Sequence, residues 1–234
     1  MAYSGTQTFN LSIEEIIQEA HERCQLEVRE GYDLKTARRS MNLLTIEWAN
    51  RGVNMWTIDE GFVNLGQGTA TYNLPADTID LLEQVIRTNE GSTTLQTDLN
   101  LSRISVDNYA SIPNKLTQGR PIQCWVDRLR DQPTINLWPV PDQGTTVDPY
   151  YVVRYWRLRR IQDAGAGIQT PDMPFRFFPA LVAGLAYYIA TKLPEGMPRL
   201  EMLKAQYDEQ YTLAAGEDRE KASEMLVPRL YGPR

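Results

Sequence analysis

The spacing of apolar residues changes twice along the chain, and this constrains the fold more than any other feature. In residues 11–52 apolar side chains recur every three or four positions, the period of an amphipathic helix. Residues 55–160 are rich in Thr, Val, Ile, Tyr and Trp, with frequent Gly, Pro, Asn and Asp, a composition typical of strands and turns. Helical spacing returns after residue 167. The sequence therefore predicts an α+β protein in which a β-rich insertion separates two pairs of helices.

The first pair of helices has clear start and stop signals. Ser12 and Glu15 have the spacing of a capping box, and the helix that follows is predicted to end near Glu30. Asp33 is a suitable N-cap for a second helix, which ends near Gly52. The short connection favours an antiparallel pair.

Two hairpins are predicted in the central region. Gly66-Gln67-Gly68 is expected to join strands at 61–65 and 69–74, and residues 131–133 to join strands at 122–129 and 134–140. Residues 79–88 are ambiguous between helix and strand, and we assign a strand. Residues 150–159 alternate strictly, which indicates a third strand beside the second hairpin.

The C-terminal part is predicted to contain two helices and a tail. Residues 177–193 are apolar nearly all round, which indicates a buried helix. A last helix begins near Pro198 and carries one apolar stripe: Leu200, Leu203, Tyr207, Tyr211 and Leu213. Residues 225–234 contain two prolines and no acid, so we expect an extended tail with a partner.

These elements predict four regions. Residues 1–54 and 165–222 form a four-helix bundle from the N- and C-terminal helix pairs. Residues 55–164 form an antiparallel β-sandwich or barrel, of which residues 79–114 are the least certain in assignment. Residues 223–234 form the extended tail.

Charge and cysteine content exclude several classes of protein. The formal net charge is −6 and the pI about 5.0, which argues against a sequence-specific nucleic-acid reader because such proteins present a basic face to phosphates. Cys24 and Cys124 lie far apart, so we expect two buried thiols in a reducing compartment and no disulfide. We predict no signal peptide and no membrane segment.

Few residues have a pattern that suggests chemistry. His21 is the only histidine and is expected to be a partly exposed helix residue; a zinc site has too few ligands. Gly66-Gln67-Gly68 lacks the spacing of a dinucleotide or phosphate-binding loop. Acidic residues spread over helix faces. We therefore expect no catalytic residue, no cofactor and no enzyme.

The densest basic run is Arg154, Arg157, Arg159 and Arg160, with Tyr155 and Trp156 between them. Phosphate contact or base stacking is one interpretation. Because the chain is acidic, we favour the other, a strand whose charged side faces solvent or a neighbouring subunit.

Three segments resemble a known family. They are Leu137-Trp138-Pro139-Val140-Pro141-Asp142; residues 178–190 (FPALVAGLAYYIA) followed by Lys192-Leu193-Pro194; and Glu217-Asp218-Arg219-Glu220 before a tail containing Pro-Arg. With the order of helical ends around a β insertion, they resemble the head-to-tail adaptors of short-tailed phages, the group of podovirus-type connectors that includes tail tubular protein A.

The resemblance implies a virion structural protein of the neck, assembled in the host cytoplasm. Such adaptors form a ring, usually of about twelve copies, between the portal protein and the tail nozzle or tail tube. Double-stranded DNA passes through the ring during ejection without sequence-specific binding. The tail would then dock into the portal through Met225, Leu226, Val227, Pro228, Arg229, Leu230, Tyr231 and Arg234.

Three alternatives stay open. The first is a tail terminator or head-completion protein of a long-tailed phage, whose sequence would show the same chemistry. A carbohydrate-binding module would need Trp125, Trp138 and Trp156 exposed in a row. An enzyme would need a deep pocket with two acids whose pKa values are strongly shifted.

Overall fold

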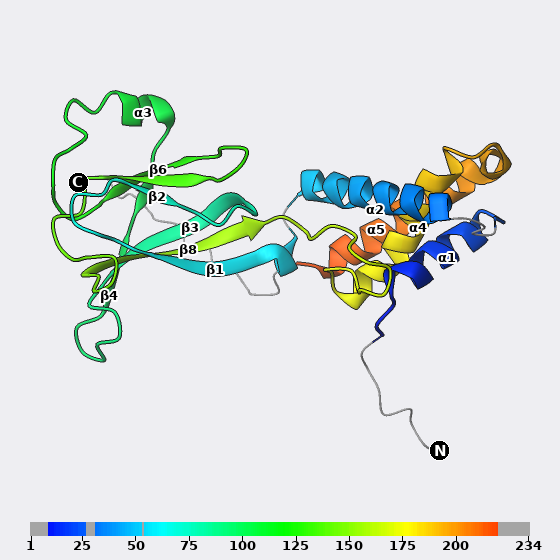
Figure 1. Cartoon of the computed structure of the whole chain (residues 1–234), viewed down its shortest axis with the longest axis horizontal. Coiled ribbons are helices and arrows are strands. Elements are labelled where there is room, and N and C mark those ends of the chain that lie inside the picture. Colours follow the sequence, from blue (N-terminus) through cyan, green and yellow to red (C-terminus); the bar gives the residue numbers. More distant parts are fainter. Residues whose placement is uncertain (1–8, 27–30, 53, 220–234) are drawn as a thin grey trace, which may run out of the picture. The chain divides into compact units, whose positions relative to one another are not determined.

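The computed structural model describes residues 9–26, 31–52 and 54–219, and the chain forms two compact units (Figure 1). The helical unit comprises residues 1–44 and 163–234, and the β unit residues 45–162. The α-helices of the described residues are α1 (Ile13–Arg23), α2 (Gly31–Arg51), α3 (Val106–Ala110), α4 (Phe178–Ala190) and α5 (Leu200–Glu217). The helix α2 begins in the helical unit and runs past the boundary at residue 44.

The capping box predicted at the start of α1 is confirmed. The Ser12 hydroxyl accepts a hydrogen bond from the Glu15 amide at 3.3 Å, and the Glu15 carboxylate accepts one from the Ser12 amide at 2.7 Å. The helix ends at Arg23, earlier than the end expected near Glu30, which lies outside the described residues. The helix α2 is already formed at Gly31, before the expected start at Asp33.

The loop at 165–169 supplies partners for the first turn of α1. The carbonyl oxygens of Gln169 and Gly167 accept hydrogen bonds from the amides of Ile13 at 2.9 Å and Glu14 at 3.0 Å. The first amides of a helix lack partners within the helix, so this loop satisfies groups that would otherwise need water. The loop therefore packs against the start of α1.

The helix α4 is the buried helix of the helical unit, as its apolar sequence predicts. It contacts both α1 and α5, and ten of its thirteen residues are buried. At Gly184 the helices approach closely: a Cβ there would lie 2.9 Å from Leu44 of α2 and 2.9 Å from Tyr207 of α5. Small side chains allow this close approach, because they let neighbouring side chains reach the helix backbone.

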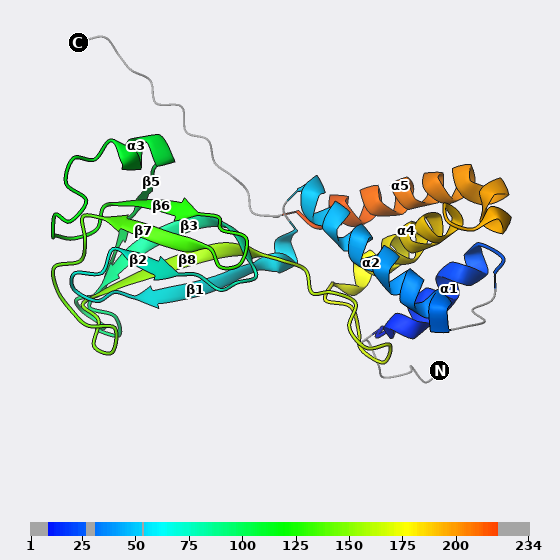
Figure 2. The same ribbon diagram turned by 45° about the horizontal axis from the view of Figure 1, so that its top comes forward.

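The strands of the β unit form two sheets of four strands each (Figure 2). The first, sheet A, is antiparallel throughout and has the order β1-β8-β3-β4. Its strands are β1 (Ile58–Asn64), β8 (Tyr151–Arg159), β3 (Thr78–Thr88) and β4 (Thr97–Asn100). The strand assigned at 79–88 is confirmed by β3.

The second, sheet B, has the order β2-β7-β6-β5. Its strands are β2 (Thr71–Asn73), β7 (Thr134–Trp138), β6 (Gln123–Asp127) and β5 (Ser102–Arg103). The hairpin predicted around residues 131–133 is confirmed by the antiparallel pair β6 and β7. The expectation of a wholly antiparallel insertion is wrong, because β5 pairs with β6 in parallel. The chain returns from β5 through α3 and a loop, a connection long enough to restore the same strand direction.

Both sheets contribute side chains to one hydrophobic core. Sheet A provides Leu81, Ile86 and Val153, and sheet B provides Val126 and Leu137. Alternation along the strands places these residues on one face of each sheet and leaves the other face to polar and mixed side chains. The core fixes the register of the strands, because a slip of one residue would turn apolar side chains outward.

Two expectations about strand partners are wrong. Residues 66–68 do not close a hairpin, because β1 pairs with β8 in sheet A while β2 pairs with β7 in sheet B. The turn instead bonds to a distant loop: the Gln67 and Gly68 amides donate to the carbonyls of Gly144 and Pro141, both at 2.9 Å. Likewise β8 lies between β1 and β3, not beside the β6-β7 hairpin.

The stripe predicted on the last helix is only partly correct. The helix α5 starts at Leu200, after a 3-10 turn that contains Pro198. Leu203 and Tyr207 are buried, whereas Leu213 is 62% exposed and Ala214 is buried in its place. Among the described helices, none is both long enough and apolar enough to cross a bilayer.

Candidate functional site

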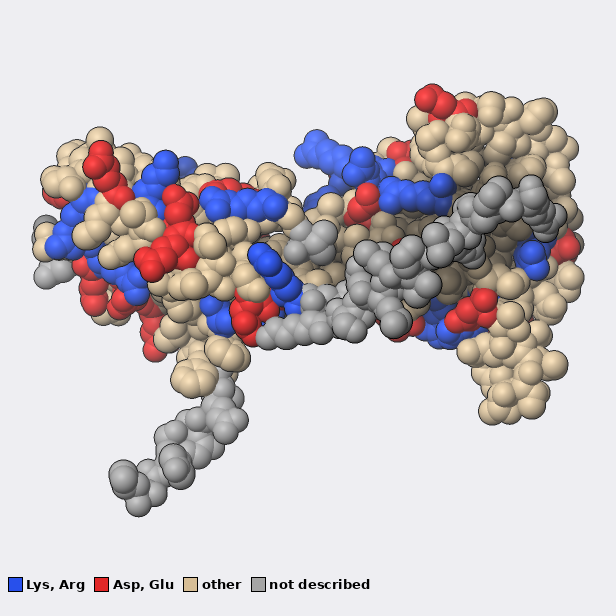
Figure 3. Space-filling view, turned by 180° about the vertical axis from the view of Figure 1, so that it is seen from behind, with Lys and Arg blue, Asp and Glu red and all other residues tan. Residues whose placement is uncertain are grey.

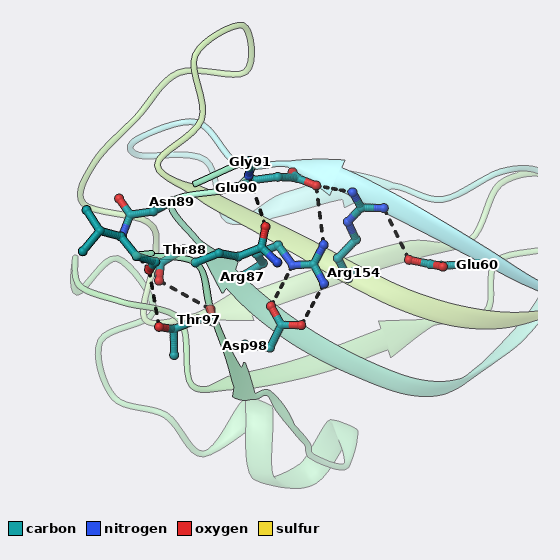
Figure 4. A network of polar contacts seen from close by, with 11 residues as sticks. Glu60, Arg87, Thr88, Asn89, Glu90, Gly91, Thr97, Asp98 and Arg154 are labelled. Carbon is teal, nitrogen blue, oxygen red and sulfur yellow. Dashed lines mark hydrogen bonds and ion pairs between the residues drawn. The ribbon is translucent and has the colours of Figure 1, made fainter. Parts of the chain in front are cut away.

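The outer face of sheet A carries a connected set of charged side chains (Figure 4). Arg154, at the middle of β8, lies beside two acids: Nη1 is 3.4 Å from Glu60 Oε1 on β1, and the other guanidinium nitrogen bonds to Glu90 after β3. The guanidinium also lies 5.1 Å from the centre of the Phe62 ring. Phe62 and Arg154 are register partners in the β1-β8 pair, so the strand alignment brings them together.

Glu90 joins Arg154 to a second arginine, Arg87 of β3 (Figure 4). Arg87 holds Asp98 of β4 through two hydrogen bonds, Nε to Oδ1 at 2.7 Å and Nη2 to Oδ2 at 2.8 Å. These bonds lower the pKa of Asp98 below its ordinary value and raise that of Arg87. Arg87 and Asp98 are register partners in the β3-β4 pair, which explains the two-point geometry.

The balance of charge on this face argues against a phosphate site. Two arginines, Arg87 and Arg154, face three acids, Glu60, Glu90 and Asp98. Each guanidinium already has carboxylate partners, so a phosphate would have to displace them while close to a surplus of negative charge. Positive and negative side chains also lie close together over much of the surface seen in Figure 3. The arrangement orders the sheet face and suits a structural surface.

Arg157 takes part in a separate group of ion pairs on the opposite face of β8. Both of its terminal nitrogens contact the Asp77 carboxylate, and Nη2 lies 3.5 Å from Asp59 Oδ2. Arg159 reaches the same Asp59 oxygen through Nε at 3.1 Å. The hydrogen bonds from Arg157 lower the pKa of Asp77. The carboxylates that pair with Arg157 and Arg159 thus come from this chain itself.

The remaining residues proposed from sequence fall in two places. Arg160 is exposed, and its amide donates to the Asp77 carbonyl at 2.8 Å. Its Nη2 lies 3.4 Å from the carbonyl of Arg130. The whole predicted docking tail, residues 225–234, lies outside the described residues.

The histidine is buried, not partly exposed as expected. His21 is 3% exposed and its Nδ1 lies 2.8 Å from the Ile17 carbonyl oxygen. The apolar stripe of α1 includes this position because residue 21 lies one turn after residue 17. Among the described residues, no group of three or more His, Cys, Asp or Glu side chains is placed to bind a metal ion.

Both cysteines are free and buried, as predicted. The Cys24 thiol lies 3.2 Å from the Ala186 carbonyl oxygen of α4. Burial raises the pKa of Cys24, and it raises that of Cys124 to about 12. Neither thiol is suited to nucleophilic chemistry, since the thiolate is the reactive form.

The three tryptophans do not form a row. Trp156 lies on sheet A and is 37% exposed, whereas Trp125 and Trp138 lie on sheet B. The Trp125 ring packs 5.3 Å from that of Tyr109 in α3, and the Trp138 indole donates to the Asn114 carbonyl at 3.1 Å. A flat sugar-binding platform requires several exposed rings on one surface, and this geometry does not provide it.

Each unit has a surface hollow, lined by described residues, that is large enough to hold a small molecule. The hollow in the helical unit has a volume of about 540 Å³ and contains a single acid: its lining residues are Arg23, Pro179, Arg199, Met202, Leu203, Gln206, Glu209 and Gln210. The one in the β unit, about 480 Å³, contains Glu90 and Asp148. Glu90 is already bonded to Arg154. Asp148 lies in a loop, where its backbone amide donates a hydrogen bond to the Thr145 hydroxyl. Neither hollow shows a nucleophile with an adjacent base.

Sequence reasoning identified Arg154 and missed its partners. Arg87, Glu90 and Asp98 come from a segment of the β region that had no assigned neighbours. Only Arg87 lies in the strand that the sequence predicted, and the register of that strand against β4 and β8 was not visible. Cross-strand ion pairs depend on that register, so only the paired sheet reveals them.

Comparisons with known proteins identify a family. The model of the SU10 adaptor protein family matches residues 12–229. Among solved structures, a chain described as "Neck of empty GTA particle computed with C6 symmetry" is similar at 10% sequence identity, covering 83% of this chain and 87% of that chain with a TM-score of 0.30. No curated protein sequence matches significantly. Because the family match spans nearly the whole chain, the protein belongs to the SU10 adaptor protein family.

Proposed function

We propose that this protein is a head-to-tail adaptor in the virion of a tailed phage. The observation that carries the proposal is the match to an adaptor family over residues 12–229, which includes both units. The charged groups support it: the arginines of β8 are paired within the chain, as expected of a structural surface. A structural role needs a rigid, ordered surface and no reacting group.

The proposal has finer parts. The chain forms a ring of about twelve copies between the portal and the tail nozzle, as in the podovirus-type adaptors related to tail tubular protein A, and DNA passes through its lumen during ejection. The helices form a four-helix bundle and the two sheets a β-sandwich, with an extended tail at residues 223–234. The protein acts in the neck of the virion after assembly in the host cytoplasm.

The tail is proposed to dock into the portal. Residues 225–234 contain apolar and arginine side chains without an acid, a composition suited to binding a partner surface. The family match extends to residue 229 and so includes the first half of this segment.

The strand β8 is proposed to lie near a subunit boundary. Arg154, Arg157 and Arg159 already pair with acids of the same chain. We therefore expect Arg160, which directly follows β8 and is exposed, to make the contact with a neighbouring subunit.

The test is the mass of the assembly in solution. The full chain is measured alone and with the portal protein of the same particle, and compared with a chain truncated after Ser223. We expect the full chain to join the portal as a ring and the truncated chain to lose binding by at least tenfold in Kd. A chain lacking residues 1–8 is the matched control, since it keeps the whole region that matches the family.

Two outcomes would overturn parts of the proposal. A full chain that stays monomeric and ignores the portal removes the adaptor function. A truncated chain that binds the portal as tightly as the full chain removes the docking role of the tail and leaves the rest of the proposal standing.

A further inference from the structure

One face of α2 carries exposed side chains at helical spacing. Tyr32 is 69% exposed and Leu43 is 48% exposed. They are eleven residues apart, which is about three turns or roughly 16 Å along a helix. Lys35 and Arg39 lie between them on the same face and are also exposed. The opposite face of α2 is buried, so packing within the unit does not use this one.

The helix α5 has an exposed face with the same spacing of apolar residues and a charge of opposite sign. Met202 is 46% exposed and Leu213 is 62% exposed, again eleven residues apart. Gln206 and the acidic Glu209 lie between them and are exposed. The other side of α5 is buried through Leu203, Tyr207 and Ala214.

The two faces match position by position when the helices run parallel. If Tyr32 lies against Met202, then Leu43 lies against Leu213, because the spacing is equal. In the same alignment Arg39 lies opposite Glu209, each seven positions from the first apolar residue. Exposed apolar residues at both ends and opposite charges between them are the pattern of a protein interface.

The charges on these faces are available for such a contact. In the described part of the chain, no ion pair engages Arg39 or Glu209. Over their full lengths the helices have opposite balance: α2 has four basic and two acidic residues, and α5 has four acidic and one basic. The two helices would therefore attract each other.

The hollow in the helical unit lies beside the α5 face. Met202, Gln206 and Glu209 line this space of about 540 Å³. Two arginines that line this hollow already have partners within the chain. Arg23 pairs with Glu19 at 2.9 Å, and Arg199 donates a hydrogen bond to the Arg23 carbonyl at 3.0 Å. In the parallel alignment Tyr32 would enter here, and aromatic side chains that fill pockets dominate many interfaces.

We propose that the α2 face of one copy docks on the α5 face of the next. The two faces differ, so the contact is head-to-tail. Each copy can use its α2 face with one neighbour and its α5 face with the other. A repeated head-to-tail contact generates a ring when the rotation closes. This inference rests on the proposed ring-forming function and names the surfaces that hold the ring together.

The experiment reverses the central charges in the full chain. Arg39→Glu and Glu209→Arg are made singly, and assembly is measured by mass in solution, both alone and on the portal. We expect each variant to need at least tenfold more protein to assemble, because like charges then meet at the contact. Asp208→Arg is the matched control: it makes the same change one residue away, where the helix points about 100° from the face.

Mixing the two single variants provides the decisive measurement. When the two variants alternate in the mixture, the glutamate at position 39 of one variant meets the arginine at position 209 of the other. At the next contact the unchanged Arg39 meets the unchanged Glu209. We expect the mixture to assemble like the unaltered chain, which also shows that both variants fold. A disulfide between a Leu43→Cys chain and a Leu213→Cys chain, with neither chain forming one alone, would support the parallel alignment independently.

The outcomes separate this inference from the proposed function. If the unaltered chain forms rings and both reversals leave them unchanged, the inference is overturned and the function stands. The same follows if the reversals abolish assembly and mixing does not restore it. If the unaltered chain forms no ring, alone or on the portal, the proposed function fails and the inference with it.

Discussion

Each of the two units packs a tyrosine ring against a glycine, and the two contacts differ in the room they leave. In the β unit, a Cβ at Gly61 would lie 2.6 Å from two ring carbons and the hydroxyl oxygen of Tyr155, its register partner. In the helical unit, a Cβ at Gly184 would meet the Tyr207 ring and the end of Leu44 at 2.9 Å. Cross-strand pairing holds Tyr155 in place, whereas two separate side chains can yield at Gly184. The comparison indicates that the contact at Gly61 tolerates an added side chain less well than the contact at Gly184.

The largest effect is expected from filling the space at Gly61. Gly61→Val would force the buried Tyr155 ring out of its position, at a cost of about 3 kcal/mol in the free energy of unfolding. Urea denaturation of the full chain measures it. Asn73→Val, at an exposed position of β2, is the control for strand propensity. Equal stabilities of the two variants would contradict the tight contact.

The next effect tests how much the helical unit depends on a local signal. Ser12→Ala removes the side chain that caps α1 and should cost about 1 kcal/mol. Hydrogen exchange should show faster exchange at the first turn of the helix. Gln18→Ala alters an exposed residue in the middle of α1 and should leave the first turn protected. If both variants exchange alike, the cap is not what holds the start of the helix.

A smaller effect is expected at Gly184. Gly184→Ala gains up to about 1 kcal/mol of helix propensity and loses a similar amount through crowding, so the net change should be below about 1 kcal/mol. Gly216→Ala has no neighbouring atom within 4 Å and should show the gain alone. The difference between the two stabilities, measured by thermal and urea unfolding, gives the packing cost. A loss at Gly184 as large as that at Gly61 would break the comparison.

The smallest effect concerns the carboxylates of the β unit. The pKa values of Asp77 and Asp98 are lowered by their arginine partners, so these ion pairs stabilise the fold above the ordinary carboxyl pKa near 3.8. That contribution is lost as the pH falls through the lower pKa of the folded state. Because both acids are substantially exposed, Asp98→Asn should cost less than about 1 kcal/mol at pH 7 and flatten the acid side of the stability profile. An unchanged profile would show that the pair contributes nothing measurable.

The sequence predicted those elements whose signals are local. The capping box of α1, the apolar run of α4, the strand β3 and the β6-β7 hairpin all match the structure. It failed where the partner lies far along the chain. The turn at residues 66–68 looks like a hairpin, but the strands on its two sides enter different sheets. His21 was expected to be partly exposed, as most surface histidines are, while the helix period places it in the buried stripe.

The candidate surfaces divide in the same way. The basic run on β8 was visible in the sequence, and its strand was assigned correctly. Its partners Glu60 and Glu90 are separated from Arg154 by 94 and 64 residues. The complementary faces of α2 and α5 also needed the structure, because exposure distinguishes Met202 and Leu213 from the buried Leu203 and Tyr207.

By itself the sequence determined the α+β class, the order of helical and β-rich regions, and the resemblance to an adaptor family. These follow from periodicity, turn residues and short motifs, which act over a few neighbouring positions. Only the tertiary structure decided the strand order of the two sheets, the pairing of Arg87, Arg154 and Arg157, and which apolar residues stay exposed. Such features depend on contacts between segments far apart in the chain, whose geometry is set by the packing of the whole core.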